Sequence, residues 1–147
     1  MNVIAIKNTV LAVLAACGTW LAHALGGWDA SMQVLVALMV ADYITGVLVA
    51  AVWHKSTKST SGALDSKAGF KGLLKKCMVL VLVMIGVLLD QAMGTEYIRM
   101  AVVLFFIGNE GLSVLENMGL MGVPYPEFMH RALEAMKEKG NKGESNE

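Results

Sequence analysis

Two apolar stretches of the sequence carry ionisable groups where a membrane helix would ordinarily carry aliphatic side chains. Asp42 lies near the middle of SMQVLVALMVADYITGVLVAAVW at 31–53, and Glu110 lies deep within residues 97–118. A charged group at the depth of the hydrocarbon is costly, so it faces a partner, a water-filled path or a substrate. The chemistry open to these carboxyl groups is proton carriage, ion pairing between helices, or the lining of an aqueous pore.

The polar residues of 97–118 recur at helical spacing. On a helical wheel they share an arc of roughly 120°, and aliphatic side chains fill the opposite face. This polar stripe consists of Arg99, Asn109, Glu110, Ser113, Glu116 and Asn117. Each aliphatic or Phe residue favours insertion by roughly 0.3–0.6 kcal/mol, whereas a central charge costs about 2.5–3.5 kcal/mol. The balance is near zero, so this helix needs partners or water along its stripe.

The stretch around Asp42 has a similar character. Thr45 and Gly46 share a helix face with Asp42. Two interpretations stay open for this face and for the stripe: lining of a pore or carrier, or hydrogen bonding between buried helices.

Motifs for catalysis and for metal binding are absent from the sequence. There is no HExxH, GxSxG or GxxxxGK[ST] pattern. Cys17 and Cys77 lie in apolar stretches without CxxC spacing, which argues against a zinc site or a disulfide framework. The net charge of zero gives no bulk attraction for nucleic acid. We therefore expect a non-enzyme with no cofactor, no metal site and no nucleic-acid partner.

The composition indicates the elements that must hold these groups. Of 147 residues, 56% are hydrophobic and only 16% are charged, with a mean hydropathy of +0.58. Four apolar segments, at about 9–25, 31–53, 77–94 and 97–118, each approach the roughly 20 residues that cross a bilayer. We predict an all-α, polytopic membrane protein with four transmembrane helices, three being possible. A soluble helical bundle is the alternative for the chain, and a cleaved signal peptide is the alternative for the first segment.

Lysines predict the orientation of the chain in the membrane. The predicted loop 54–76 is basic, whereas the links at 26–30 and about 90–97 contain no lysine or arginine within the turns. The positive-inside rule then makes the loop and both termini cytoplasmic. The basic residues of the loop are Lys55, Lys58, Lys67, Lys71, Lys75 and Lys76. They suit a short interfacial helix beside anionic lipid headgroups, or simply a solvated loop.

The remaining predictions concern domains and helix packing. Residues 1–123 form the predicted membrane domain, and 124–147 form a cytoplasmic tail that begins as an amphipathic helix and ends polar. Small residues on one face of the first segment, together with Gly46, allow close helix approach. On the first segment these are Ala12, Ala16 and Thr19.

Three stretches together resemble the toxin-secretion/phage-lysis holins, which include the TcdE-like proteins. They are DYITG at 42–46, STSGALDSKAGFKGLLKK at 59–76 and NEGLSVLENMGLMGVPYPEFM at 109–129. Their order and spacing extend through about 90 residues, whereas the first helix fits by hydropathy only. The motif positions include Asp42, Gly46, Asn109, Glu110, Glu116 and Asn117, and the resemblance assigns no individual role to them.

The resemblance implies a small protein of the bacterial cytoplasmic membrane, usually phage-encoded. It implies a homo-oligomer that opens non-selective lesions and so releases an endolysin or a toxin, without necessarily contacting it. A small proton-coupled transporter or ion channel using Asp42 or Glu110 is the alternative, and a non-conducting membrane scaffold is a third class.

Overall fold

The computed structural model describes residues 2–59 and 61–143 and consists of five α-helices joined by short links. In chain order the elements are α1 (Val3–Ala24), α2 (Ala30–Leu48), the π-helical turn η1 (Val49–Trp53), α3 (Ser66–Met93), α4 (Ile98–Leu120) and α5 (Glu127–Lys142). Four segments are long and apolar enough to cross a membrane: α1, α2 with η1, α3 and α4. The predicted all-helical architecture with four such helices is confirmed. Residue 60 of the predicted basic loop and the ends of the predicted domains, residues 1 and 144–147, lie outside the described residues.

Aspartates cap the starts of α2 and α3. Asp29 caps α2, because its side chain accepts the Met32 N–H at 2.8 Å. Asp65 caps α3 in the same way, accepting the Lys67 N–H at 2.9 Å. Since α3 starts at Ser66, the basic run through Lys76 is part of the same helix as the third apolar segment. The loop before it is therefore shorter than the predicted 54–76, and its second half is not a separate interfacial helix.

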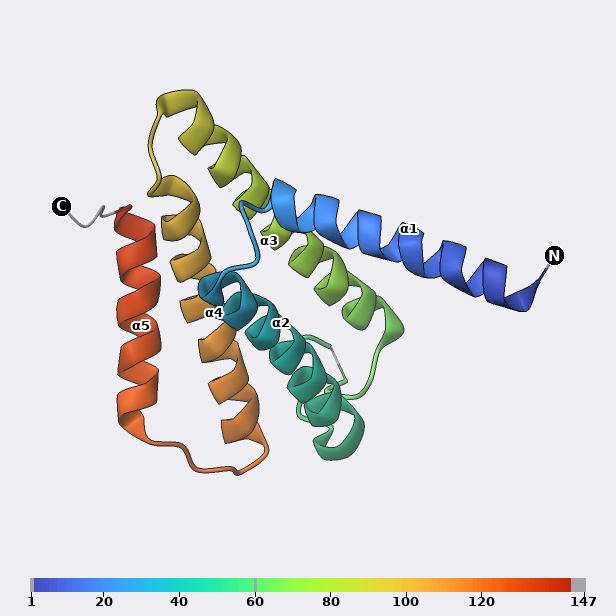
Figure 1. The fold of residues 1–147 in the computed structure, drawn as a ribbon. Helices are drawn as coiled ribbons and strands as arrows, with labels where there is room; N and C mark the ends of the chain where they lie inside the picture. Colours follow the sequence, from blue (N-terminus) through green and yellow to red (C-terminus); the bar gives the residue numbers. More distant parts are fainter. Residues whose placement is uncertain (1, 60, 144–147) are drawn as a thin grey trace.

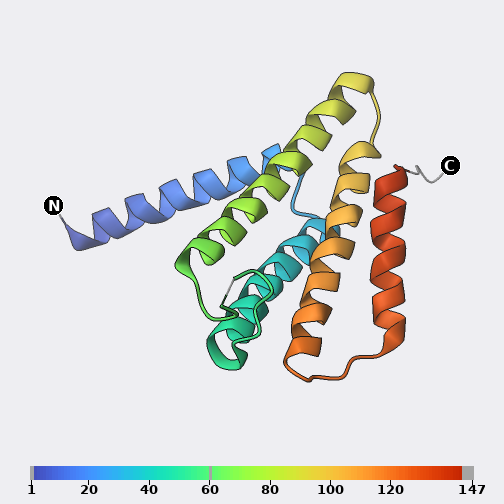
Figure 2. The ribbon, with the colours of Figure 1, turned by 180° about the vertical axis from the view of Figure 1, so that it is seen from behind.

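α4 lies at the centre of the bundle. Figures 1 and 2 show α2 and α3 on one side of α4 and α5 on the other. The apolar core lies where α2, α3 and α4 meet, and Leu35, Val83 and Val103 are fully buried there. Gly86 of α3 permits a close approach to α4, because a Cβ at this position would lie 3.0 Å from the Arg99 Cα.

The first helix differs from the others. α1 buries none of its residues, and it projects away from the bundle (Figure 1). Ala12, Ala16 and Thr19 are exposed, and the Thr19 hydroxyl donates to the Ala15 carbonyl of its own helix at 2.9 Å. Their predicted packing therefore has no partner helix within the described chain and stays a prediction for contacts between copies.

The C-terminal helix packs back along α4 instead of extending from the bundle. The link at 121–126 reverses the chain, so α5 runs antiparallel to α4 (Figure 1). Three glycines permit this packing. Added Cβ atoms at Gly108 and Gly111 would meet Leu133 within 3 Å, and one at Gly140 would meet the backbone of Ala101 and Phe105. The tail predicted to begin as an amphipathic helix and to lie in the cytoplasm thus contributes a helix that runs along most of α4.

Candidate functional site

Asp42 of α2 and Asn117 of α4 form a buried hydrogen-bonded contact between their helices. The Asn117 amide donates to the Asp42 carboxylate at 3.0 Å and to the Thr45 hydroxyl at 2.9 Å. The Thr45 hydroxyl in turn donates to the Ala41 carbonyl at 2.8 Å. Gly46 lies next to this contact, and a Cβ there would be 3.7 Å from the Asn117 nitrogen, an ordinary van der Waals distance, so the contact does not itself require a glycine.

Lys76 of α3 joins the same contact from the third helix. Its ammonium nitrogen lies 2.8 Å from Asp42 Oδ2 and also pairs with Glu110 Oε2 of α4. The Lys76 side chain is only 12% exposed, and the two carboxylates are buried as well. One buried cation therefore bridges two buried anions on two other helices. Breaking this arrangement would leave charges without partners in a poorly solvated region.

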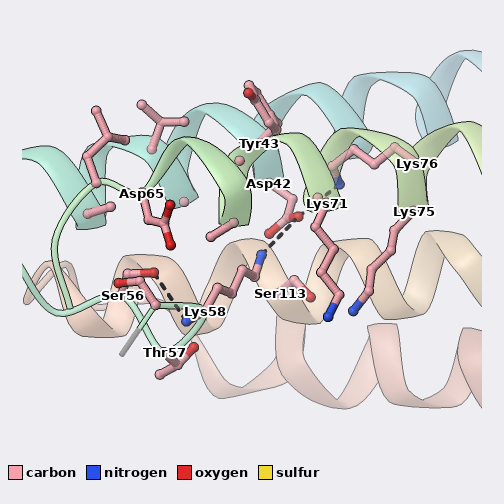
Figure 3. Close-up of a pocket in the computed structure, with 18 of the residues that line it drawn as sticks. Asp42, Tyr43, Ser56, Thr57, Lys58, Asp65, Lys71, Lys75, Lys76 and Ser113 are labelled. Atoms are coloured by element: carbon pink, nitrogen blue, oxygen red, sulfur yellow. Dashed lines mark hydrogen bonds and ion pairs between the residues drawn. The ribbon is translucent and has the colours of Figure 1, made fainter. Parts of the chain in front are cut away.

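A pocket of about 490 Å³ opens beside this cluster. The loop after η1 forms one wall, and from it Lys58 reaches to 3.6 Å from Asp42 Oδ2. Figure 3 shows Lys58 directed toward Asp42, with Lys71 and Lys75 of α3 extending past Ser113. Asn109, Glu110 and Ser113 of the α4 stripe line the pocket together with hydroxyl groups of the loop. The pocket is thus polar at its base and lysine-rich around it.

The loop wall is fixed by backbone geometry. His54 ends η1 in the left-handed region, with φ of 50°. Gly62 has φ of 71°, and a side chain there would collide with the His54 carbonyl. The Ser56 N–H donates to the Gly62 carbonyl at 2.9 Å, which closes the loop onto itself. These contacts hold Lys58 near the buried cluster.

Arg99 forms a second polar cluster at the opposite end of α4. Its guanidinium donates to the Leu25 and Gly27 carbonyls at 2.6 and 3.2 Å and to Asp29 Oδ2 at 2.7 Å. The bonds to the carbonyls satisfy backbone acceptors at the end of α1, where a helix leaves them unpaired. One arginine therefore ties the α1–α2 link to the start of α4.

Two aspartates complete this second cluster. Asp90 of α3 accepts the Ile98 and Arg99 N–H groups at 3.0 and 2.8 Å and the Thr95 hydroxyl at 2.6 Å, so it caps α4 from the preceding helix. Asp29 lies in the link before α2. Burial raises the pKa of its carboxyl, but hydrogen bonds from Arg99, Met32 and Ser31 outweigh burial and lower the pKa to about 2. Asp29 thus stays ionised opposite Arg99.

The residues predicted from sequence lie in different places in the structure. Asp42, Thr45, Glu110 and Asn117 come together in one cluster, and Asn109 and Ser113 lie beside it in the pocket wall. Arg99 belongs to the second cluster, and Glu116 is exposed. Among the basic residues, Lys58, Lys71 and Lys75 line the pocket, whereas Lys55 and Lys67 are exposed outside it.

Three contributors were not identified from sequence. Lys76 was predicted at the membrane surface, yet it forms the centre of the buried cluster. The position of Lys76 directly before the third apolar segment is the sequence feature that indicates a role within the helix bundle. Asp29 directly precedes α2 and fits the recognised capping pattern, whereas Asp90 lies within α3, eight residues before the start of α4, and has no such local signal. Within the described residues, no group of three His, Cys, Asp or Glu side chains is placed to hold a metal ion.

Comparisons with known proteins cover most of the chain. The sequence model of the bacteriophage holin family matches residues 19–138. An uncharacterised protein of Clostridium perfringens is 36% identical over 126 residues, which are 84% of this chain and 87% of the relative. An uncharacterised protein of Clostridium acetobutylicum is 35% identical over 133 residues, 88% of this chain and 100% of the relative. One of Listeria monocytogenes is 39% identical over 113 residues, 76% and 75% of the two chains. No solved structure matches the chain.

Proposed function

Because the chain belongs to the bacteriophage holin family, we propose that it acts as a holin that assembles with copies of itself in the bacterial cytoplasmic membrane. The assemblies open non-selective pores through which an endolysin or a toxin leaves the cell. No cofactor takes part, and the released protein is a functional partner without direct contact. The four apolar helices support a multi-pass membrane location, and the holin family is not an enzyme family.

The observation that carries this proposal is the pairing of Lys76 with Asp42 and Glu110 across three apolar helices. Polar groups that would be costly against lipid are satisfied within one protomer, so a single chain inserts without water at these positions. We assign an interhelical role to Asp42, Thr45, Glu110 and Asn117 in this state. The ion-paired helices form a stable unit that accumulates in the membrane before pores open.

The surfaces that do not pack within one protomer favour assembly of several copies in the membrane. α1 offers an apolar face with the small residues Ala12, Ala16 and Thr19, which suits close contact with a neighbouring copy. At the other end of the bundle, Lys58, Lys71 and Lys75 surround the pocket mouth. Together with Lys55 and Lys67 they suit the headgroups of anionic lipids at the cytoplasmic surface.

Release of trapped solutes tests the proposal directly. The purified chain is reconstituted into vesicles that contain a small dye and a protein-sized dextran. A holin releases both, abruptly and without saturation, once enough copies are present. Release of neither solute by membrane-inserted protein would exclude pore formation.

A proton-coupled carrier is the second candidate, and the buried carboxylates at the base of the pocket are the observation that favours it. A carrier predicts saturable, pH-dependent flux of a small solute and retention of the dextran. Induced expression in a growing bacterium separates the two further, because a holin kills suddenly and a carrier is tolerated.

A further inference from the structure

α5 lies along a helix that is built to cross the membrane. Gly140 of α5 packs against Ala101 and Phe105, only one to two turns from the start of α4 at Ile98. At the middle of α4, Gly108 and Gly111 pack against Leu133 and Lys137. Because glycines of both helices form the contact, the backbones of α4 and α5 come close together. Larger side chains at these positions would collide, so the α4–α5 interface is specific. α5 therefore accompanies α4 along most of its length, and its end lies beside the start of α4, on the side opposite the basic loop, whereas the sequence predicts a cytoplasmic C-terminus.

The outer face of α5 is unsuited to lipid. The helices long and apolar enough to cross a membrane are α1 to α4, and α5 is not one of them. Its Leu133 and Met136 turn toward α4 and are partly buried, whereas charged side chains occupy the far side. The exposed charged residues are Glu127, Arg131, Glu134, Glu138 and Lys142. Ion pairs at this surface, such as Lys142 with Glu138 at 2.8 Å, leave both side chains more than half exposed.

These two facts together exclude lipid as the surroundings of the outer face of α5. Charged side chains on a helix at the depth of α4 face either another protein surface or an aqueous cavity. α2 and α3 cover α4 from the opposite side, so they do not shield the outer face of α5 (Figure 2).

We propose that α5, docked on α4, forms the wall of the aqueous pore in the assembled protein. Its outer face, defined by Arg131, Glu134, Ala135 and Glu138, lines the water-filled lumen, and α4 stands behind it with its own stripe turned to α2 and α3. This inference rests on the proposed holin function and identifies the residues that meet the released cargo.

A disulfide between α4 and α5 provides the test. A Cβ at Gly111 would lie 3.2 Å from Leu133 Cγ, which places a cysteine pair at these positions within disulfide reach. The variant Gly111→Cys/Leu133→Cys is made in a full chain whose Cys17 and Cys77 are replaced by Ala. If docked α5 lines the lumen, the oxidised protein releases dye and dextran at the same rate as the reduced protein. If oxidation stops release and reduction restores it, α5 must leave α4 for the pore to open, and the proposal is overturned.

A fluorescent probe gives a second measurement that does not depend on leakage. After oxidation, a thiol-reactive probe is attached to Ala135→Cys, an exposed position on the outer face of α5. The expected result is quenching by aqueous iodide and little quenching by brominated lipid. A probe at Leu82→Cys, an exposed apolar position of α3, is the matched control and is quenched by brominated lipid. Lipid quenching at position 135, or failure of the disulfide to form in membranes, would overturn the proposal. Failure of the reduced protein to release any solute, with iodide quenching intact, would instead count against the holin function alone.

Discussion

The ammonium nitrogen of Lys76 lies 2.8 Å from a carboxylate oxygen of Asp42, and the two residues are 34 positions apart on different helices. Because Glu110 pairs with the same nitrogen, the buried cluster holds two negative charges and one positive charge. Lys58 approaches Asp42 at 3.6 Å from a more exposed position. The effect of a substitution therefore depends on which charge it removes.

Replacing Lys76 with Leu should strongly destabilise the helix bundle. The change leaves Asp42 and Glu110 buried without their common cation, and removal of one partner from a buried pair costs about 3–5 kcal/mol. The free energy of unfolding in mixed detergent micelles measures this loss. Lys75→Leu is the matched control, since the neighbouring Lys75 is exposed at the pocket edge. Equal stability of the two variants would contradict the role assigned to Lys76.

Replacing Glu110 with Leu should have a much smaller effect. The remaining Lys76 and Asp42 form a balanced pair, so no buried charge loses its partner and the loss of stability should be well below that of Lys76→Leu. Dye release from vesicles should persist, because Glu110 holds helices together and does not line the lumen. Loss of release by a variant that still inserts and remains folded would show that the α4 stripe faces the pore. Glu96→Leu, an exposed change in the α3–α4 link, controls for the loss of a negative charge.

Replacing Arg99 with Lys should loosen α1 from the bundle. The guanidinium binds two carbonyls and one carboxylate at once, and an ammonium group does not reproduce this planar arrangement. Spin labels on α1 and α3 should then report a broader distance distribution than in the parent chain. Lys7→Arg, a conservative change near the start of α1, should leave the distribution as it is. An unchanged distribution in Arg99→Lys would mean that other contacts position α1.

The ion pair of Asp29 with Arg99 should make stability depend on pH in the acidic range. The pKa of Asp29 is lowered from 3.8 to about 2, so its contribution is full above pH 3.8 and is lost as pH falls toward 2. Asp29→Asn retains a capping side chain but lacks the charge, so the stability of this variant should fall less over the same interval. Asp65→Asn, at the capped start of α3, should keep the slope of the parent. Identical slopes for Asp29→Asn and the parent would refute the assignment.

The lysines around the pocket should make the protein respond to anionic lipid. Phosphatidylglycerol added to the detergent-solubilised protein should raise its melting temperature more than phosphatidylcholine does. Lys71→Gln/Lys75→Gln should reduce this difference, and Lys55→Gln/Lys67→Gln should reduce it less, because the latter two side chains lie outside the pocket. Equal responses to the two lipids would argue against a headgroup contact at this site.

The sequence predicted the parts of the structure that depend on local pattern. Hydropathy located the four long helices, and helical spacing placed Asn109, Glu110, Ser113 and Asn117 on one face of α4. Arg99 belongs to that face too, but 18 residues of helix separate it from Asn117 by roughly 27 Å along the axis. A helical wheel shows the angle of each residue around the helix axis but not its position along the axis. The prediction therefore grouped Arg99 with residues that it does not contact.

The features that the sequence did not reveal depend on tertiary packing. Six lysines lie between the second and third apolar segments, and their composition does not indicate that Lys76 is the one that bridges Asp42 and Glu110 in the buried cluster. The docking of α5 depends on Gly108, Gly111 and Gly140 meeting across two helices. Each of these glycines is unremarkable by itself, and only the antiparallel arrangement gives them a common role.

The capping of α4 by Asp90 bears on how the chain is made. The carboxylate that closes the start of α4 comes from eight or nine residues upstream, so this hairpin needs only a short loop to form. The pairing of Lys76 with Glu110 then joins α3 and α4 toward the open end of this hairpin. α4 is only marginally apolar because of Glu110. During biosynthesis this helix thus leaves the insertion machinery with the Glu110 carboxylate already paired with Lys76 of α3, the helix synthesised just before it.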